Sequence, residues 1–174
     1  MFNLGANVLA ALVVGFAGSP PPAVAQPAQV RIDAALQNIT QLVRTGRIGY
    51  ATIWDGNKFV QCRRLQEHTL RCEAAGSTMQ SSLKNVLTND RLAAIFKLGW
   101  AFDPSFGNYV RTFPAGTSTN TAAEQILGVL KEGYGAAPDA IAVATAWVAD
   151  TPCPPRAGPS QNLAGSVNDA SSMQ

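Results

Sequence analysis

The residues whose type and spacing most directly suggest chemistry are the three cysteines, Cys62, Cys72 and Cys153. Cys62 and Cys72 lie ten residues apart on either side of a predicted turn, a spacing that suits a disulfide in an oxidising compartment. A redox-active pair would need a C-x-x-C-like spacing or a neighbouring charge that lowers a thiol pKa, so we expect a structural disulfide. Cys153 is left over, and it is either a free thiol or a link to another chain.

Nucleophilic catalysis would depend on His68, because it is the only histidine. A Ser-His-Asp or Cys-His arrangement needs this residue near a nucleophile and an orienting carboxylate. The candidate nucleophile Cys72 is better explained as oxidised, and a histidine in a hairpin loop is typically exposed and idle.

Other catalytic or cofactor signatures are weak. Neither a His pair nor a Cys pair at zinc-finger spacing occurs, and no phosphate-binding or dinucleotide-binding glycine loop is present. We therefore predict no enzyme, metal site or cofactor. Four carboxylates could meet only through the fold, and the first three suit turn or cap roles: Asp55, Asp90, Asp103 and Glu124.

Aromatic residues suggest a contact surface between two predicted elements. Trp54, Trp100 and Trp147 stand at strand or helix-end positions, which favours the core. The segment from Trp100 to Tyr109, however, interleaves aromatics with proline and glycine, and exposed apolar patches mark binding sites. The predicted binding residues are Trp100, Phe102, Phe106 and Tyr109.

Charge argues against nucleic acid as a partner. The formal net charge is only +2, and 14% of the residues are charged. Nucleic-acid binding needs basic residues clustered on one face. The densest basic group, Arg63, Arg64 and Arg71, surrounds one hairpin and is typical of a solvated strand face.

The first 25 residues indicate export. They contain no charged side chain, and the apolar run Val8–Ala17 is followed by a proline-rich break and by Ala23-Val24-Ala25. This pattern is that of a signal peptide with an A-x-A cleavage site. The ten-residue run would span roughly 15 Å, about half of a bilayer core, so we expect cleavage after Ala25 and no stable membrane anchor. The predicted location is periplasmic or secreted.

Three helical segments are expected in the mature chain. Apolar residues recur at steps of three and four over residues 30–44, which Gly46 would end. A second helical region begins after Gly76, runs through residues 79–98 with a restart at Asn89-Asp90, and ends at Gly99. The third covers Thr121–Glu132 and ends around Tyr134.

Five strands are expected, and the spacing of the cysteines bears on their register. Residues 48–54, 59–65 and 70–74 form a predicted meander, joined by residues 108–113 and by the continuous apolar run 141–148, which indicates burial on both faces. If the second hairpin is centred on Glu67, Cys62 lies directly opposite Cys72 and the two sulfurs can bond. A loop with an even number of residues would place them on opposite faces.

These elements predict an α+β fold. The order α-β-β-β-α-β-α-β gives a two-layer sandwich of about five antiparallel strands flanked by three helices. The predicted organisation is a signal peptide over residues 1–25, one domain over 26–149 and a disordered tail over 150–174, rich in proline, glycine and serine.

A set of spaced residues resembles a known domain family. It comprises a Leu-Gly-Trp triplet, a turn proline, a following strand and the end of a helix: Leu98, Gly99, Trp100, Pro104, Asn108, Arg111, Tyr134 and Gly135. This set is similar to the domains named for type III secretion chaperones and YbjN-like proteins (TY-Chap), over residues 30–137.

The resemblance implies a helix-flanked antiparallel sheet that is often dimeric, has no catalytic residues and binds another polypeptide. The chain departs from the family in its export signal and disulfide, since secretion chaperones act in the cytosol, and in residues 141–148, which have no clear counterpart. We therefore expect an exported protein-binding or peptide-binding module that presents either a sheet edge or the segment from Trp100 to Tyr109 to its partner. The alternative is a small exported hydrolase whose site is assembled only in the fold.

Overall fold

Three α-helices and six β-strands form two layers in a computed structural model, which describes residues 26–42, 44–65 and 68–150. This arrangement confirms the predicted α+β sandwich, with one strand more than expected. None of the helices in this described part is long and apolar enough to cross a bilayer. The elements in chain order are α1 (Ala28–Gln41), β1 (Arg47–Asp55), β2 (Lys58–Arg64), β3 (Leu70–Ala74), η1 (Ser81–Leu83), α2 (Asn89–Lys97), β4 (Ala101–Asp103), β5 (Asn108–Phe113), α3 (Thr119–Gly128), η2 (Val129–Gly133), η3 (Pro138–Ala140) and β6 (Ala142–Ala149).

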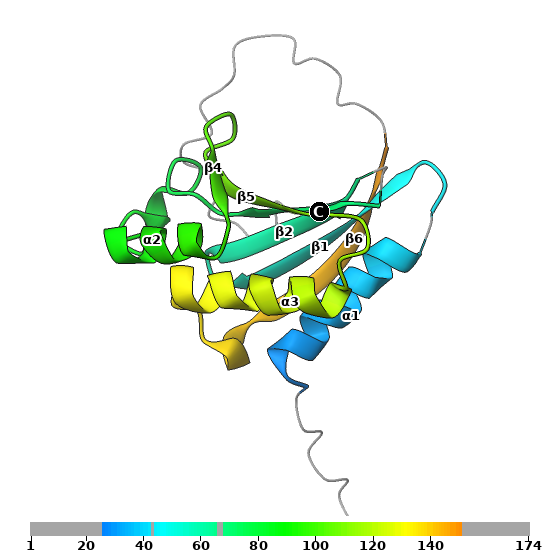
Figure 1. Ribbon diagram of the computed structural model, residues 1–174, viewed down its shortest axis with the longest axis horizontal. Coiled ribbons are helices and arrows are strands. Elements are labelled where there is room, and N and C mark those ends of the chain that lie inside the picture. The colour runs from blue at the N-terminus through cyan, green and yellow to red at the C-terminus, as the bar shows by residue number, and fades with distance from the viewer. Residues whose placement is uncertain (1–25, 43, 66–67, 151–174) are drawn as a thin grey trace, which may run out of the picture.

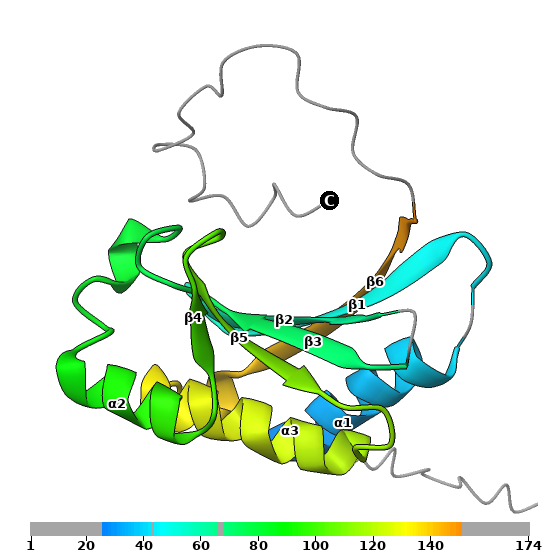
Figure 2. The same cartoon turned by 45° about the horizontal axis from the view of Figure 1, so that its top comes forward.

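The six strands form one antiparallel sheet in the order β4-β5-β3-β2-β1-β6. All three α-helices lie on the same face of this sheet (Figures 1 and 2). Side chains therefore alternate along each strand between a helix-covered face and an open face. In β1, for example, Gly49, Ala51 and Ile53 are buried on the covered face.

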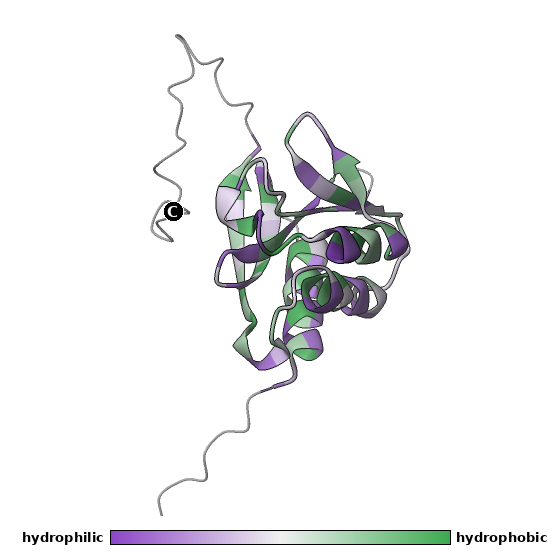
Figure 3. Ribbon diagram, turned by 90° about the vertical axis from the view of Figure 1, so that its left-hand side faces the viewer, coloured by the Kyte–Doolittle hydropathy of each residue, from purple (hydrophilic) through white to green (hydrophobic). Residues whose placement is uncertain are grey.

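The core lies between the helices and this covered face. In α1, Ile32, Leu36 and Ile39 are fully buried and follow the spacing that places them on one side of a helix. The helices carry both hydrophobic and hydrophilic residues, as helices that pack on one side require (Figure 3). The predicted first helix is thus confirmed, although it ends at Gln41 and leaves Arg44 in the following loop.

Two tight hairpins set the register of the central strands. Gly56 has a φ of +60° and takes the first central position of the β1–β2 turn, where a type II′ turn requires a positive φ. In the β2–β3 hairpin Cys62 pairs directly with Cys72, and their sulfurs are bonded. The predicted disulfide is confirmed, and closing a ten-residue loop stabilises the folded chain by about 3 kcal/mol.

The region between β3 and α2 differs from the prediction. Residues 79–87 form turns and the short 3-10 helix η1 instead of an α-helix, and only α2 is α-helical there. Leu83 and Leu87 are buried, but Met79 is 63% exposed, so the spacing of apolar residues did not correspond to one helical face. Serine and asparagine favour turns over helix interiors, and Thr88 has an extended backbone immediately before α2.

Two further differences concern element bounds. The strand β4 was not expected, because three residues are too few to show an alternating pattern. It pairs with β5 around a turn at residues 104–107. The third helix begins earlier than predicted, at Thr119, because the Ser118 side chain accepts a hydrogen bond from the Thr121 N–H. It continues as the π-helical turn η2.

Tyr134 holds the end of this helical segment against the sheet. It is fully buried, and its hydroxyl donates a hydrogen bond to the carbonyl oxygen of Ala75, just after β3. Burial raises the pKa of the Tyr134 phenol well above its ordinary value of 10. The folded protein therefore keeps this side chain neutral.

Alkaline unfolding tests this contact. The stabilising contribution of Tyr134 is complete below the pKa of an unfolded tyrosine, about 10, and is lost as the pH rises above it, because only the unfolded chain then releases the proton. We expect Tyr134→Phe to lower the free energy of unfolding at pH 7 by about 1–3 kcal/mol, since it leaves the Ala75 carbonyl without its partner. In denaturant titrations between pH 8 and 11, the free energy of unfolding should also fall less steeply with pH for the variant than for the unaltered protein. The same fall in both proteins would contradict this role of Tyr134.

Candidate functional site

The strand β6 forms one edge of the sheet. It pairs with β1 along its whole length, from Arg47↔Ala149 to Trp54↔Ala142, and no strand in the described part of the chain pairs with its other side. Its eight residues carry no charge, and Ala144, Thr145 and Ala146 are exposed. The prediction that this apolar run is buried on both faces is wrong, because the helices cover only one face of the sheet and leave Ala144 and Ala146 exposed on the other.

The edge strand borders the apolar part of the open face. On β1, Tyr50, Thr52 and Trp54 pair with Ala146, Ala144 and Ala142 of β6, and all of them lie on the face opposite the helices. The small alanine side chains leave the β6 backbone accessible from this side.

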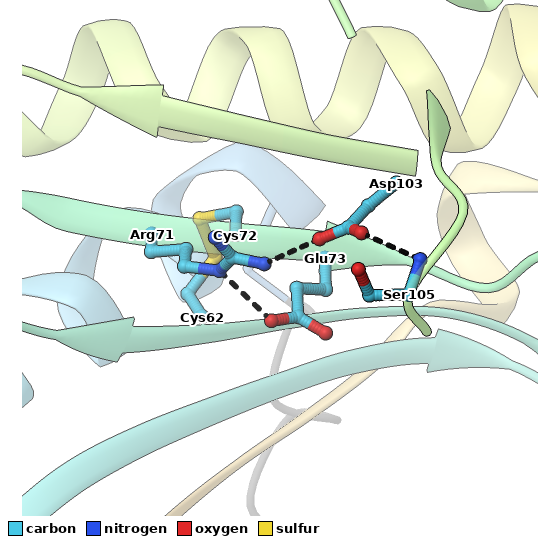
Figure 4. Close-up of polar contacts among 6 residues, drawn as sticks. All are labelled: Cys62, Arg71, Cys72, Glu73, Asp103 and Ser105. Atoms are coloured by element: carbon cyan, nitrogen blue, oxygen red, sulfur yellow. Dashed lines mark hydrogen bonds and ion pairs between the residues drawn. A yellow bond between two sulfur atoms is a disulfide. The ribbon is translucent and has the colours of Figure 1, made fainter. Parts of the chain in front are cut away.

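The far part of the open face is polar and internally paired. The Arg71 guanidinium contacts Glu73 at 3.0 Å (Nε to Oε1) and Asp103 at 3.0 Å (Nη2 to Oδ2), which links β3 to β4 across β5 (Figure 4). The hydrogen bond to Glu73 is the main cause of a raised Arg71 pKa, and the Ser105 backbone N–H is the main cause of a lowered Asp103 pKa. One guanidinium is thus engaged by two carboxylates, and all three charged groups already have partners, so this part of the face is a poor candidate for a charged ligand.

Trp147 packs where β6 meets the helix layer. It lies directly across from Gly49, and a Cβ built on Gly49 would lie 2.9 Å from the Ile39 Cβ and 3.1 Å from the Trp147 Cη2. The absence of a side chain at Gly49 thus lets α1 and the Trp147 indole approach β1 closely. The Arg44 guanidinium carbon lies 4.7 Å from the indole centroid, a cation–π contact.

The predicted aromatic patch is only partly on the surface. Trp100 is 2% exposed and Tyr109 is 6% exposed, so these two belong to the core. Trp100 turns inward directly after Gly99, whose φ of +79° ends α2. Phe102 and Phe106 are exposed at 45% and 57%, which leaves a narrower apolar surface than the spacing predicted.

The residues that carry the family resemblance make structural contacts. Gly99 packs against the Arg111 guanidinium, where a Cβ would lie 2.7 Å from Nη1, and Asn108 accepts a hydrogen bond from the Gly76 N–H at 3.1 Å. The carbonyl oxygen of Tyr134 accepts a hydrogen bond from Arg91 at 3.0 Å. Of the other members, Leu98 packs against the core, Pro104 lies in the turn after β4, and Gly135 has a left-handed backbone conformation.

The titratable residues considered for catalysis do not converge. His68 is exposed in the β2–β3 loop, and its Nδ1 lies 2.8 Å from the Arg64 Nη2, so its recorded partner is a cation instead of a carboxylate. Cys72 is in the disulfide and has no thiolate to supply. Asp55 pairs with Lys58 at 3.2 Å, while Asp103 binds Arg71. Over residues 26–42, 44–65 and 68–150, no group of three His, Cys, Asp or Glu side chains could hold a metal ion.

Comparisons with family models, curated proteins and solved structures find no match for this chain. The resemblance to TY-Chap domains therefore stays a hypothesis. The function has to be inferred from the geometry of β6 and its surroundings, which sequence reasoning did not single out. One signal was available: a glycine inside the strand IGYATIW indicates a close approach by another element.

Replacing Gly49 tests how Trp147 is positioned. Gly49→Ala should lower the free energy of unfolding by about 1–3 kcal/mol, because the new methyl group collides with Ile39 and the indole. The matched control is Gly128→Ala, at a helical position where the new Cβ would lie 3.8 Å from the nearest Leu98 carbon. This control should stabilise the protein by about 0.5–1 kcal/mol. Equal effects of the two variants in denaturant titrations would contradict the close approach at Gly49.

Proposed function

We propose that the protein is an exported, non-catalytic binding module that takes an extended segment of another polypeptide onto β6. The observation that carries this proposal is the outer edge of an eight-residue strand without charge, which no other strand of residues 26–42, 44–65 and 68–150 pairs with. Alternate backbone N–H and C=O groups of an antiparallel edge strand point away from its neighbour and are available to a further strand. Strand addition of this kind is an established mode of peptide recognition.

The side chains of β6 favour a polypeptide partner. Ala144, Thr145 and Ala146 are small, so the backbone of an incoming strand can approach to about 4.8 Å, the spacing between neighbouring strands. Eight residues extend over roughly 27 Å, which provides a row of hydrogen-bonding groups longer than a small molecule can satisfy.

The opposite edge of the sheet is much less suited to this role. The strand β4 has three residues and is followed by Pro104 in a turn. Short edge strands and nearby charges such as Asp103 discourage pairing with other chains. Natural proteins usually protect a long apolar edge in these ways, whereas β6 is eight residues long and has no charged residue within the strand.

Export is supported by the disulfide and by the leader. The Cys62–Cys72 bond is characteristic of proteins that fold outside the reducing cytosol. The apolar run and A-x-A site in residues 1–25 lie outside the described residues, and they remain the sequence argument for a signal peptide. Both features support a periplasmic or secreted location.

Photo-crosslinking in cells that make the protein tests strand addition directly. A photo-reactive phenylalanine analogue incorporated at Thr145 should crosslink to one continuous segment of a partner protein, identified by mass spectrometry. Placing lysines on the edge with Ala144→Lys and Ala146→Lys should reduce the crosslink yield at least about tenfold, because an incoming strand would have to desolvate two charges.

The matched control is Ala101→Lys, an exposed open-face position on the opposite edge strand β4, which should leave the yield unchanged. Thermal unfolding of each variant establishes that it is folded. Equal crosslinking with and without the β6 lysines would contradict the proposal. Crosslinks confined to β6 of a second copy would replace it with self-association.

A further inference from the structure

A cavity of about 230 Å³ opens at the end of β6 and carries an excess of positive charge. It is bounded by the end of α1, the loop before β1, the start of β1, the end of β2 and the end of β6. Its charged lining consists of Arg44, Arg47 and Arg64 against the single acidic residue Asp150. Trp147 and aliphatic side chains such as Leu42 complete it. We call this cavity the arginine pocket.

The three arginines are not neutralised by their described neighbours. None of them forms an ion pair with a carboxylate of residues 26–42, 44–65 and 68–150. Arg64 donates to the His68 ring nitrogen, and Arg44 stacks on Trp147. Three guanidinium groups around one small cavity repel one another, and an anion placed among them would relieve this repulsion.

The chemistry of the lining narrows the ligand. Guanidinium groups match the planar geometry of a carboxylate and can bind both of its oxygens. The indole and the aliphatic side chains favour an apolar or aromatic body attached to that carboxylate. The volume lies below the roughly 300–1,000 Å³ of pockets for drug-sized ligands, so the pocket suits a small acid or the last residue of a polypeptide.

We propose that the arginine pocket binds a carboxylate carried on an apolar or aromatic body. This site goes beyond strand addition at β6 and does not depend on it, because its cationic residues come from the loop before β1 and from the ends of β1 and β2. A free organic acid and the terminal residue of a polypeptide share the required chemistry.

Titration calorimetry on the full, oxidised chain tests this binding with defined probes. N-acetyl-phenylalanine should bind, whereas its amide, which has the same shape without the charge, should bind at least about tenfold more weakly. Inorganic phosphate should also bind more weakly, since it lacks the apolar body. Comparing 3-phenylpropionate with a tripeptide that ends in phenylalanine identifies the source of the carboxylate, as the tighter ligand is the better model of it.

Variants of the arginine pocket provide a second test of the same binding. Arg44→Gln and Arg64→Gln should each weaken N-acetyl-phenylalanine binding about tenfold, whereas Lys131→Gln, which removes an exposed cation from η2, should leave it unchanged. Thermal unfolding establishes that each variant is folded.

Three results would overturn the proposal: equal binding of the acid and its amide, equal binding of phosphate, which would indicate an adventitious anion only, or arginine variants without effect. The variant Ala144→Lys/Ala146→Lys separates the two proposals. It should reduce strand addition at β6 at least about tenfold and retain binding of the acid, so failure of one function is distinguishable from failure of the other.

Discussion

The structure depends on the packing of all three α-helices against one face of the sheet. This constraint determines which alternate residues of each strand are buried, and it gives β1 its buried series of Gly49, Ala51 and Ile53. It requires α1 to approach β1 closely at Gly49, where Ile39 occupies the space that a side chain would take. The disulfide lies in the same buried layer, since Cys62 and Cys72 are both fully covered.

One-sided packing also explains where the protein can bind. Once the helices cover one face, the free surfaces of the sheet are its open face and its two edges. The polar part of the open face is engaged in ion pairs around Arg71, and the β4 edge is short. Within the described part of the chain, the edge of β6 offers unpaired backbone groups, and the arginine pocket at its end offers guanidinium groups without a carboxylate partner.

Much of the fold could be predicted from the sequence because local patterns determine it. The helical spacing of Ile32, Leu36 and Ile39 indicated α1, and the equal distance of Cys62 and Cys72 from residue 67 indicated the register of their hairpin. Hydrophobic spacing was misleading at residues 79–87, where turn-forming residues prevent a regular helix and Met79 points to solvent.

The candidate site could not be predicted in the same way. The continuous apolar composition of residues 141–148 indicated burial on both faces, but composition does not show how many layers cover a sheet, and here the helices cover one face only. The arginine pocket combines residues from Ile39 to Asp150, and only the pairing of β1 with β6 brings these segments together. Likewise, Trp100 and Phe102 are close in sequence, yet one is buried and the other exposed.

The proposed function depends on β6, which is bonded to β1 on one side and, among the described residues, is unpaired on the other. Residue-resolved amide hydrogen exchange of the isolated protein, at a concentration where sedimentation shows a single copy, tests this pairing most directly. The account predicts alternation along residues 142–149: amides bonded to β1 are protected, and the intervening amides exchange close to the rate of an unstructured chain. Uniform protection of all eight residues would contradict the account, because it would mean that the outer edge is already occupied.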